Sequence, residues 1–283
     1  MFHQTNACAK AAWHGKLYCT AAGGHELTLD LPICAAEARF NATMAFLSGG
    51  ITIQGDDPRS WLSSERRDLA KRAMPPMEGP PHILDLFDGV GSDWSPGLFV
   101  RVVKTSWDSW WVVGHCNGTS AAVAKTIAAS MLPVASGAKQ LEPTELAVLD
   151  IHDGRYLGGL NDHHQMVTKS LDASLWRIWR SRPYPWVVGC DRHLSEGGWA
   201  VKDVQWHSSA PTSGTLTITM RGLTTEPTLV RILLPTPWKP LDSAFKQLRV
   251  MRVYAPLCMC VLPLGPAASG DDRTVTLAFG HTP

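Results

Sequence analysis

The sequence is short of charged residues and has no long apolar run. Only 18% of its residues are charged, and 26 Lys and Arg residues nearly balance 25 Asp and Glu residues. This balance excludes binding of nucleic acid by bulk positive charge. No run approaches the ~18 uninterrupted apolar residues of a membrane span, so we expect no contact with a membrane. The beginning of the sequence has no basic segment followed by an apolar one, so we expect no secretory signal and synthesis in the cytoplasm.

The cysteines do not form a recognisable framework. They number seven, an odd count, and lie scattered at positions 8, 19, 34, 116, 190, 258 and 260. Most have apolar neighbours, as in the segment LCMCVLP. In a reducing compartment such cysteines behave as small buried hydrophobic residues.

Strand-like segments dominate the sequence. Tyrosine is rare, with four residues, whereas 12 tryptophans, 20 prolines and 24 glycines indicate many turns and large rigid side chains. The alternating run at 98–106 and the apolar run at 110–116 predict a β-hairpin. Further strands, bounded by residues that favour turns, are predicted at 185–190, 199–207, 214–223, 228–235, 248–263 and 273–280.

Helices are expected to be few and short. Three segments have apolar residues at helical spacing and end before a proline: 58–74, 119–132 and 171–182. A fourth helix is predicted at 241–248. The sequence contains no internal repeat that would indicate a solenoid or an array.

Together these elements predict a mainly β protein. We expect an antiparallel β-sandwich or jelly-roll-like barrel, with three or four short helices in its loops. Residues 1–283 are predicted to form a single elaborated β-sandwich domain. The segment 74–82 contains four prolines, so it is either the place where a domain boundary would fall or a long loop.

The segment GGITIQGDDP at 49–58 raises the question of a metal-binding carboxylate pair. Gly-Asp-Asp after a hydrophobic strand resembles the metal-binding motif of viral RNA polymerases. A polymerase needs a further acidic strand, which the 54 residues before Gly55 do not supply. We therefore predict a short strand at 51–53, a turn, and a helix capped by Asp57 with Pro58 in its first turn.

The densest group of metal-ligand residue types consists of Asp150, His152, Asp153, Asp162, His163 and His164. Imidazoles and carboxylates suit Zn²⁺ or a non-haem metal. However, His163 and His164 would point to opposite sides of a strand, and residues 152–154 also suit a turn. We predict neither a metal site nor a cofactor.

Cys116 and Cys190 are candidate nucleophiles of a cysteine-dependent hydrolase, with His193 or His207 as the base. A histidine directly precedes Cys116, but in a strand it cannot easily reach the sulfur of its neighbour. Because cysteine is so often interior, buried structural cysteines are the favoured interpretation. No catalytic residue is predicted.

The segment WRIWRSRPYPW at 176–186 interleaves aromatic and basic residues. Stacking surfaces beside guanidinium groups can bind single-stranded nucleic acid. The candidate residues for such binding are Trp176, Arg177, Arg180 and Arg182. The alternative is an amphipathic helix with a packed aromatic face and solvated arginines.

Several segments share features with one family. AKAAWHGKLYCTAAGG at 9–24 has a Trp and a Gly before an alternating strand, and FNATMAFLSGGITIQG at 40–55 leads through Gly into a strand. LRVMRVYAPLCMCVLP at 248–263 and TVTLAFG at 274–280 have the pattern of closing strands. These segments resemble the jelly-roll capsid proteins of picornavirus-like particles, including the comoviruses and nepoviruses.

The resemblance implies a structural protein, namely a viral capsid or shell component located in the virion. Its expected partners are copies of itself or other shell proteins, with at most weak contact with RNA. We expect no enzyme. Two alternatives come from other classes: the cysteine-dependent hydrolase, and a carbohydrate-binding module in which some of the 12 tryptophans stack on sugars.

Overall fold

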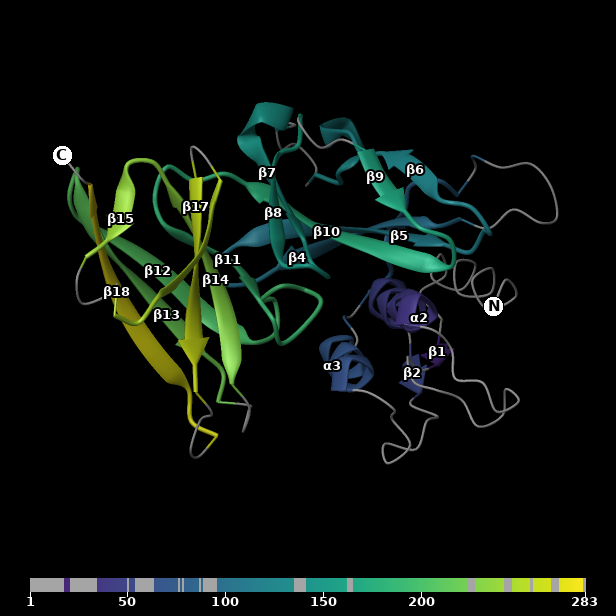
Figure 1. Cartoon of the computed structure of the whole chain (residues 1–283), viewed down its shortest axis with the longest axis horizontal. Helices are drawn as coiled ribbons and strands as arrows, with labels where there is room; N and C mark the ends of the chain where they lie inside the picture. The colour runs from purple at the N-terminus through teal and green to yellow at the C-terminus, as the bar shows by residue number, and fades with distance from the viewer. Residues whose placement is uncertain are drawn as a thin grey trace.

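The computed structural model describes residues 18–20, 35–49, 51–53, 64–75, 77, 79–86, 88, 96–134, 141–161, 165–222, 227–241, 246–254, 257–265 and 270–281. Within these residues the protein is mainly β, and its larger sheets are antiparallel (Figure 1). The predicted fold class is confirmed. Neither α-helix of the described part is both long and apolar enough to cross a membrane.

The first large sheet has six strands. Their order is β3 (His82–Ile83), β4 (Leu98–Lys104), β5 (Ser109–Asn117), β10 (Asp172–Arg180), β7 (Leu146–Asp150) and β8 (Arg155–Gly159). A small sheet of β6 (Val123–Thr126) and β9 (Gln165–Thr168) lies against one face of this sheet, and helices lie against the other face (Figure 1). Two 3₁₀ turns, Ala129–Met131 and Pro143–Glu145, complete this region.

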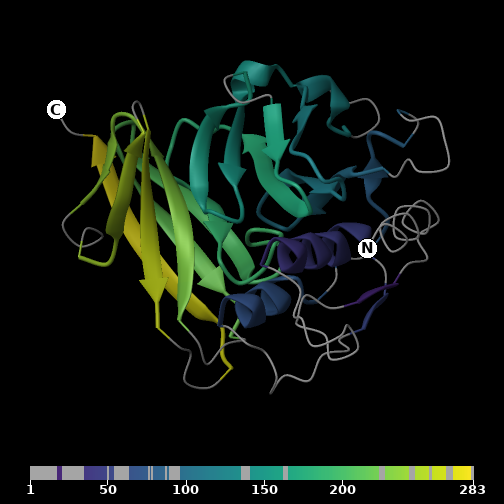
Figure 2. The same ribbon diagram turned by 45° about the vertical axis from the view of Figure 1, so that its right-hand side comes forward.

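The second half of the chain forms the predicted sandwich. One sheet has the order β11 (Trp186–Cys190), β14 (Thr228–Pro235), β17 (Leu257–Leu264) and β16 (Arg249–Tyr254). The other has the order β12 (Val201–Ala210), β13 (Ser213–Met220), β18 (Arg273–His281) and β15 (Trp238–Pro240). The two sheets face each other (Figure 2), and their apolar residues belong to one core cluster with those under the helices.

The helical side begins with a parallel pair of strands. β1 (Tyr18–Thr20) and β2 (Ile51–Ile53) pair in parallel, and α2 (Ala35–Ser48) connects them. α2 packs across β5 and β10 at a point where Gly114 replaces a larger residue. A Cβ at Gly114 would lie 2.8 Å from Cδ1 of Leu175 and would also collide with Leu47. The small residue therefore lets the helix approach the sheet closely. α3 (Ser64–Arg72) lies beside α2 (Figure 2).

Most predicted strands are confirmed. The hairpin at 98–106 and 110–116 is β4 and β5, which pair antiparallel from Leu98 with His115 to Lys104 with Ser109. The run at 248–263 is the pair β16 and β17. The short strand at 51–53 is β2, and the helix predicted at 58–74 is present as α3. Asp57 and Pro58 lie outside the described residues.

Two predicted helices are wrong. Within 171–182, residues 172–180 form β10, whose side chains are buried on both faces of the sheet, and this burial hides the two-residue period of a strand. Residues 119–132 contain β6 and a 3₁₀ turn instead of a helix. The strand forms because β6 pairs with the distant β9. Of the helix predicted at 241–248, residues 242–245 lie outside the described part, and Lys246 and Gln247 lie in a turn.

The α2 helix was not predicted. Nine of its 14 residues are buried, including Phe40, Phe46 and Leu47. A helix that is buried on almost all sides has no polar face, so its sequence lacks the amphipathic period by which helices are recognised.

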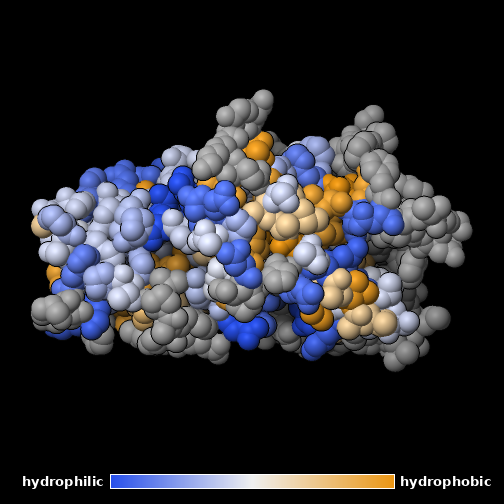
Figure 3. All heavy atoms as spheres, turned by 90° about the horizontal axis from the view of Figure 1, so that it is seen from above, coloured by the Kyte–Doolittle hydropathy of each residue, from blue (hydrophilic) through white to orange (hydrophobic). Residues whose placement is uncertain are grey.

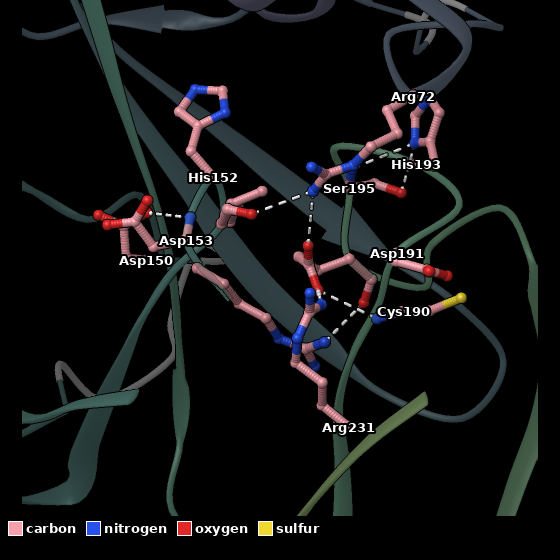
Figure 4. A network of polar contacts seen from close by, with 12 residues as sticks. Arg72, Asp150, His152, Asp153, Cys190, Asp191, His193, Ser195 and Arg231 are labelled. Atoms are coloured by element: carbon pink, nitrogen blue, oxygen red, sulfur yellow. Dashed lines mark hydrogen bonds and ion pairs between the residues drawn. The ribbon is translucent and has the colours of Figure 1, made fainter. Parts of the chain in front are cut away.

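A buried carboxylate joins the sandwich to the helical side. Glu196, in the loop after β11, is fully buried. Its carboxylate accepts hydrogen bonds from Arg231 of β14 at 2.7 Å, from Arg72 of α3 at 3.3 Å and from the backbone N–H of Cys190 at 3.0 Å. Figure 4 shows these three partners converging from different elements. Burial raises the pKa of Glu196, and the neighbouring guanidinium groups oppose that shift.

Arg177 of β10 adds to this cluster from the sheet. It is fully buried, donates to the backbone carbonyl of Glu196 at 2.7 Å, and lies 4.0 Å from the ring centre of Trp110. Burial lowers the pKa of Arg177 to about 10, so the side chain stays cationic at neutral pH. Glu196 thus links β10, β11, β14 and α3, and we call it the Glu196 clamp.

Replacing Glu196 by Gln is expected to lower the free energy of unfolding by about 3 kcal/mol, because two arginines lose a charged partner in a buried place. Urea denaturation measures the change. The matched control is Glu145→Gln, since Glu145 pairs with Arg180 at 3.1 Å with side chains 38% and 65% exposed. That change is expected to cost less than about 1 kcal/mol. Equal effects at the two sites would contradict the role of the clamp.

His193 lies next to the clamp and has both ring nitrogens engaged. Nδ1 is 2.7 Å from Oγ of Ser195, and Nε2 is 2.8 Å from the carbonyl oxygen of Pro75. Burial lowers the pKa of His193 to about 4, and Arg72 contributes in the same direction. The ring is therefore neutral in the folded protein at pH values where it is charged in the unfolded chain.

Because the folded pKa of His193 lies below the unfolded one, stability is lost as pH falls from about 6.5 towards 4, by up to roughly 3 kcal/mol. His193→Gln retains an amide donor for Pro75 but has no titration in this window. We expect the free energy of unfolding of the variant to depend less on pH between 6.5 and 4 than that of the wild type. Urea denaturation at several pH values measures this dependence. If the free energy of unfolding changed with pH equally in the variant and the wild type, the inferred pKa of His193 would be wrong.

Candidate functional site

A pocket of about 470 Å³ opens where β7, β8, β9 and β10 meet. Its polar lining residues are Asp150, Arg155, Gln165 and Ser174. Its apolar and aromatic lining residues are Tyr156, Leu157, Val167 and Trp176. This volume and mixture of a few polar groups with aromatic surface are typical of small-molecule sites.

The strand register places three of these residues in one row. Trp176 of β10 lies directly opposite Asp150 of β7, and Asp150 lies directly opposite Arg155 of β8. Ser174 precedes Trp176 by two positions, so it points to the same face of β10. The row is created by antiparallel pairing alone, because the three residues come from three different strands.

β9 forms the other side of the pocket. Along this strand Met166 and Thr168 are buried, whereas Gln165 and Val167 are exposed. Val167 is 61% exposed, the largest fraction among the large apolar residues that the structure describes. Seen from the side of β6 and β9, the surface carries an apolar area near the centre and right, with hydrophilic residues between its parts (Figure 3).

The electrostatics of the pocket are set by Asp150 and Arg155. Burial raises the pKa of Asp150, whereas Arg155 and the backbone N–H of Asp153, which donates to Oδ1 of Asp150 at 3.0 Å, oppose the rise. Figure 4 shows Asp150 and Asp153 at this turn. Because carboxylate and guanidinium lie on neighbouring strands, the row presents both hydrogen-bond acceptors and donors without a large net charge.

The structure separates the residues proposed for nucleic-acid binding. Trp176 faces the pocket, whereas Arg177 points to the opposite face of the sheet and is fully buried in the Glu196 clamp. Arg180 is exposed and pairs with Glu145, and Arg182 pairs with Asp108 at 2.7 Å. These four residues do not form one surface, because the segment is a strand and not a helix.

The candidate cysteines lie in the core. Cys190 is fully buried, and burial raises its pKa to about 12, the opposite of what a reactive thiolate needs. Cys116 is 3% exposed and belongs to the core under α2. His193 is held by Ser195 and Pro75 as described above, and His207 lies exposed on β12 beside Gln205.

The group of metal-ligand residue types is only partly described. Asp150, His152 and Asp153 lie at the turn between β7 and β8, where Nε2 of His152 is 3.1 Å from Oγ1 of Thr43. Within the residues that the structure describes, no three His, Cys, Asp or Glu side chains are grouped so as to hold a metal. Asp162, His163 and His164, like the Gly55–Asp57 motif, lie outside those residues.

Sequence reasoning named only part of this pocket. Trp176 and Asp150 were singled out for other roles, whereas Arg155, Gln165 and Ser174 were not singled out. The signal that could have found them is the cross-strand register, and it was hidden because residues 171–182 were predicted as a helix.

Comparisons with known proteins give no family. No protein-family model matches the chain, and no curated protein matches it. Among solved structures it is similar to alpha-galactosidase I from Mortierella vinacea, with 13% identity and a TM-score of 0.40. The match covers 53% of this chain and 36% of that chain, so it spans about a third of the neighbour's length. A TM-score this low does not establish a common fold, and the resemblance to capsid proteins stays a prediction.

Proposed function

We propose that this chain is a non-catalytic binding protein that holds a small, uncharged, polyhydroxylated ligand, such as a sugar unit, in the pocket between β7, β8, β9 and β10. The observation that carries the proposal is the row of Trp176, Asp150 and Arg155 across three neighbouring strands. It combines an aromatic surface with an acceptor and a donor in a cavity of about 470 Å³.

The polar groups of the pocket suit hydroxyl groups. A carboxylate accepts hydrogen bonds, a guanidinium donates them, and the amide of Gln165 and the hydroxyl of Ser174 extend the set. Each hydroxyl of a sugar both donates and accepts, so it can satisfy either kind of partner. Because Asp150 and Arg155 balance each other, the pocket does not favour a ligand with a net charge.

Trp176 supplies the aromatic part of the site. It is 5% exposed and packs in the core cluster on the β9 side of the sheet, so its orientation is fixed and its accessible edge can contact the C–H groups of a sugar ring. Tyr156 also borders the pocket, but its ring packs near that of Trp179 in the core on the other side of the sheet. The exposed side chain of Val167 lies at the pocket as well.

Titration calorimetry of the purified chain with glucose, galactose, mannose, xylose and their disaccharides tests the proposal. At least one of these sugars is expected to bind. Asp150→Asn and Arg155→Ala are each expected to weaken that binding about tenfold or more, because each removes a charged hydrogen-bond partner.

The matched control is Arg180→Ala. Arg180 lies exposed at the end of the same strand as Trp176, and neither it nor its partner Glu145 is among the residues that line the pocket. This variant is expected to bind like the wild type. If no sugar of the panel binds at millimolar concentration, or if the pocket variants bind as tightly as the control, the proposal is wrong.

The sequence also predicts a viral shell role and, as an alternative, a cysteine-dependent hydrolase. A role in a viral shell stays a prediction, and size-exclusion chromatography under assembly conditions tests it, since a stable monomer would count against it. For the hydrolase, burial raises the pKa of Cys190 to about 12, which disfavours a thiolate there, and Cys116 is buried in the core.

A further inference from the structure

A chain of hydrogen bonds leads from the interior of the protein to the pocket. His115 of β5 and Ser174 of β10 are directly opposite each other in the sheet, and Thr168 of β9 bonds to both. Nδ1 of His115 is 2.9 Å from Oγ1 of Thr168, which donates to Oγ of Ser174 at 3.0 Å. His115 and Thr168 are 3% and 1% exposed, whereas Ser174 lines the pocket.

The protons of this chain run in one direction. Oγ of Ser174 donates its single proton to the carbonyl oxygen of Val167 at 3.2 Å, so towards Thr168 it acts as acceptor. Thr168 uses its single proton for Ser174, so it must accept from His115. The geometry therefore assigns the proton of the His115 ring to Nδ1.

The surroundings of His115 keep the ring neutral. Burial lowers the pKa of His115 to about 4, and Lys125 contributes in the same direction, while Asp85 opposes it. Lys125 and Asp85 form an ion pair at 2.9 Å, so their fields at the ring oppose each other, and that of Lys125 is the larger. A neutral ring with its proton on Nδ1 donates to Thr168 and leaves Nε2 unprotonated.

From these contacts we propose that His115 and Thr168 are positioning residues that fix Ser174 as a hydrogen-bond acceptor in the pocket. Ser174 then determines specificity, because it accepts a hydrogen bond from a ligand hydroxyl and has no proton left for a ligand oxygen or fluorine. The statement about the ligand rests on the function proposed above. The direction of the proton chain does not.

The consequence is a defined chemical preference. The carboxylate of Asp150 also accepts hydrogen bonds, so the pocket offers two acceptors that pair with donors on the ligand. A ligand that has a carbonyl, an ether or a fluorine where a hydroxyl should face Ser174 leaves the second lone pair of the serine oxygen without a donor, because Thr168 donates only to the first. Sites built around a hydrogen bond reject analogues that lack it.

The first experiment needs no ligand. Long-range ¹H–¹⁵N NMR spectra of the intact chain distinguish the two neutral tautomers of histidine, and the signals missing from His115→Asn identify His115. We expect the Nδ1–H tautomer, neutral at pH 7. The Nε2–H tautomer or a charged ring at pH 7 would reverse the proton chain and overturn the inference.

The second experiment measures specificity with the sugar of the panel that binds most tightly and its deoxyfluoro derivatives, one hydroxyl at a time. Fluorine accepts weakly but cannot donate. One derivative is expected to bind about tenfold more weakly to the wild type, since it removes the donor to Ser174. Thr168→Val removes the hydroxyl that donates to the serine and leaves only the Val167 carbonyl to hold its direction, so there the loss should shrink to about threefold or less.

Thr168→Ser is the matched control, because it retains the hydroxyl and should restore the full discrimination. A discrimination that is the same in Thr168→Val and in the wild type, or the absence of any sensitive position, would overturn the specificity role while the proposed function stands. Failure of every sugar to bind would overturn the proposed function instead, and the NMR result would still decide the direction of the proton chain.

Discussion

The arrangement of this protein depends on one buried charge. Glu196 brings together arginines from α3 and β14, a backbone N–H from β11 and, through its carbonyl, an arginine from β10. Removing a charge from water is unfavourable unless its partners are close and well oriented, so these four elements can adopt only positions that satisfy the carboxylate. Gly189 contributes by its lack of a side chain, because a Cβ there would collide with Oε2 of Glu196. The clamp therefore fixes how the six-stranded sheet meets the sandwich.

The pocket is a product of that fixed sheet. No single strand contains it, since its aromatic, acidic and basic residues come from β10, β7 and β8 and meet only through their register. β9 completes the pocket from a different sheet, and the hydroxyl of Thr168 attaches it to β10. Its walls are paired strands: β10 and β7 have a neighbouring strand on both sides, and β8 and β9 each have one. Such pre-organisation lowers the entropy that a ligand loses on binding.

Much of the fold could be predicted from the sequence, and the reasons for the failures are physical. The strands of the sandwich and the hairpin of β4 and β5 have turn residues at both ends, so local chemistry is enough to find them. β10 was predicted as a helix and α2 was not predicted. Both are buried on nearly all sides, and a segment without a solvent-exposed face has no periodic pattern of polar and apolar residues. Of the pocket, the sequence indicated the residues with conspicuous chemistry, such as Asp150 and Trp176. Arg155 and Ser174 matter only through pairing between distant segments, which one sequence does not show.

β10 carries a constraint of another kind. Its neighbours Trp176 and Arg177 point to opposite faces, so one residue borders the pocket while the next enters the Glu196 clamp. A shift of this strand by one residue would exchange the two and place a guanidinium in the pocket and an indole beside a buried carboxylate. The proposed ligand binding and the Glu196 clamp therefore depend on adjacent residues of β10. Insertions or deletions within this strand cannot alter one without the other, whereas point substitutions can.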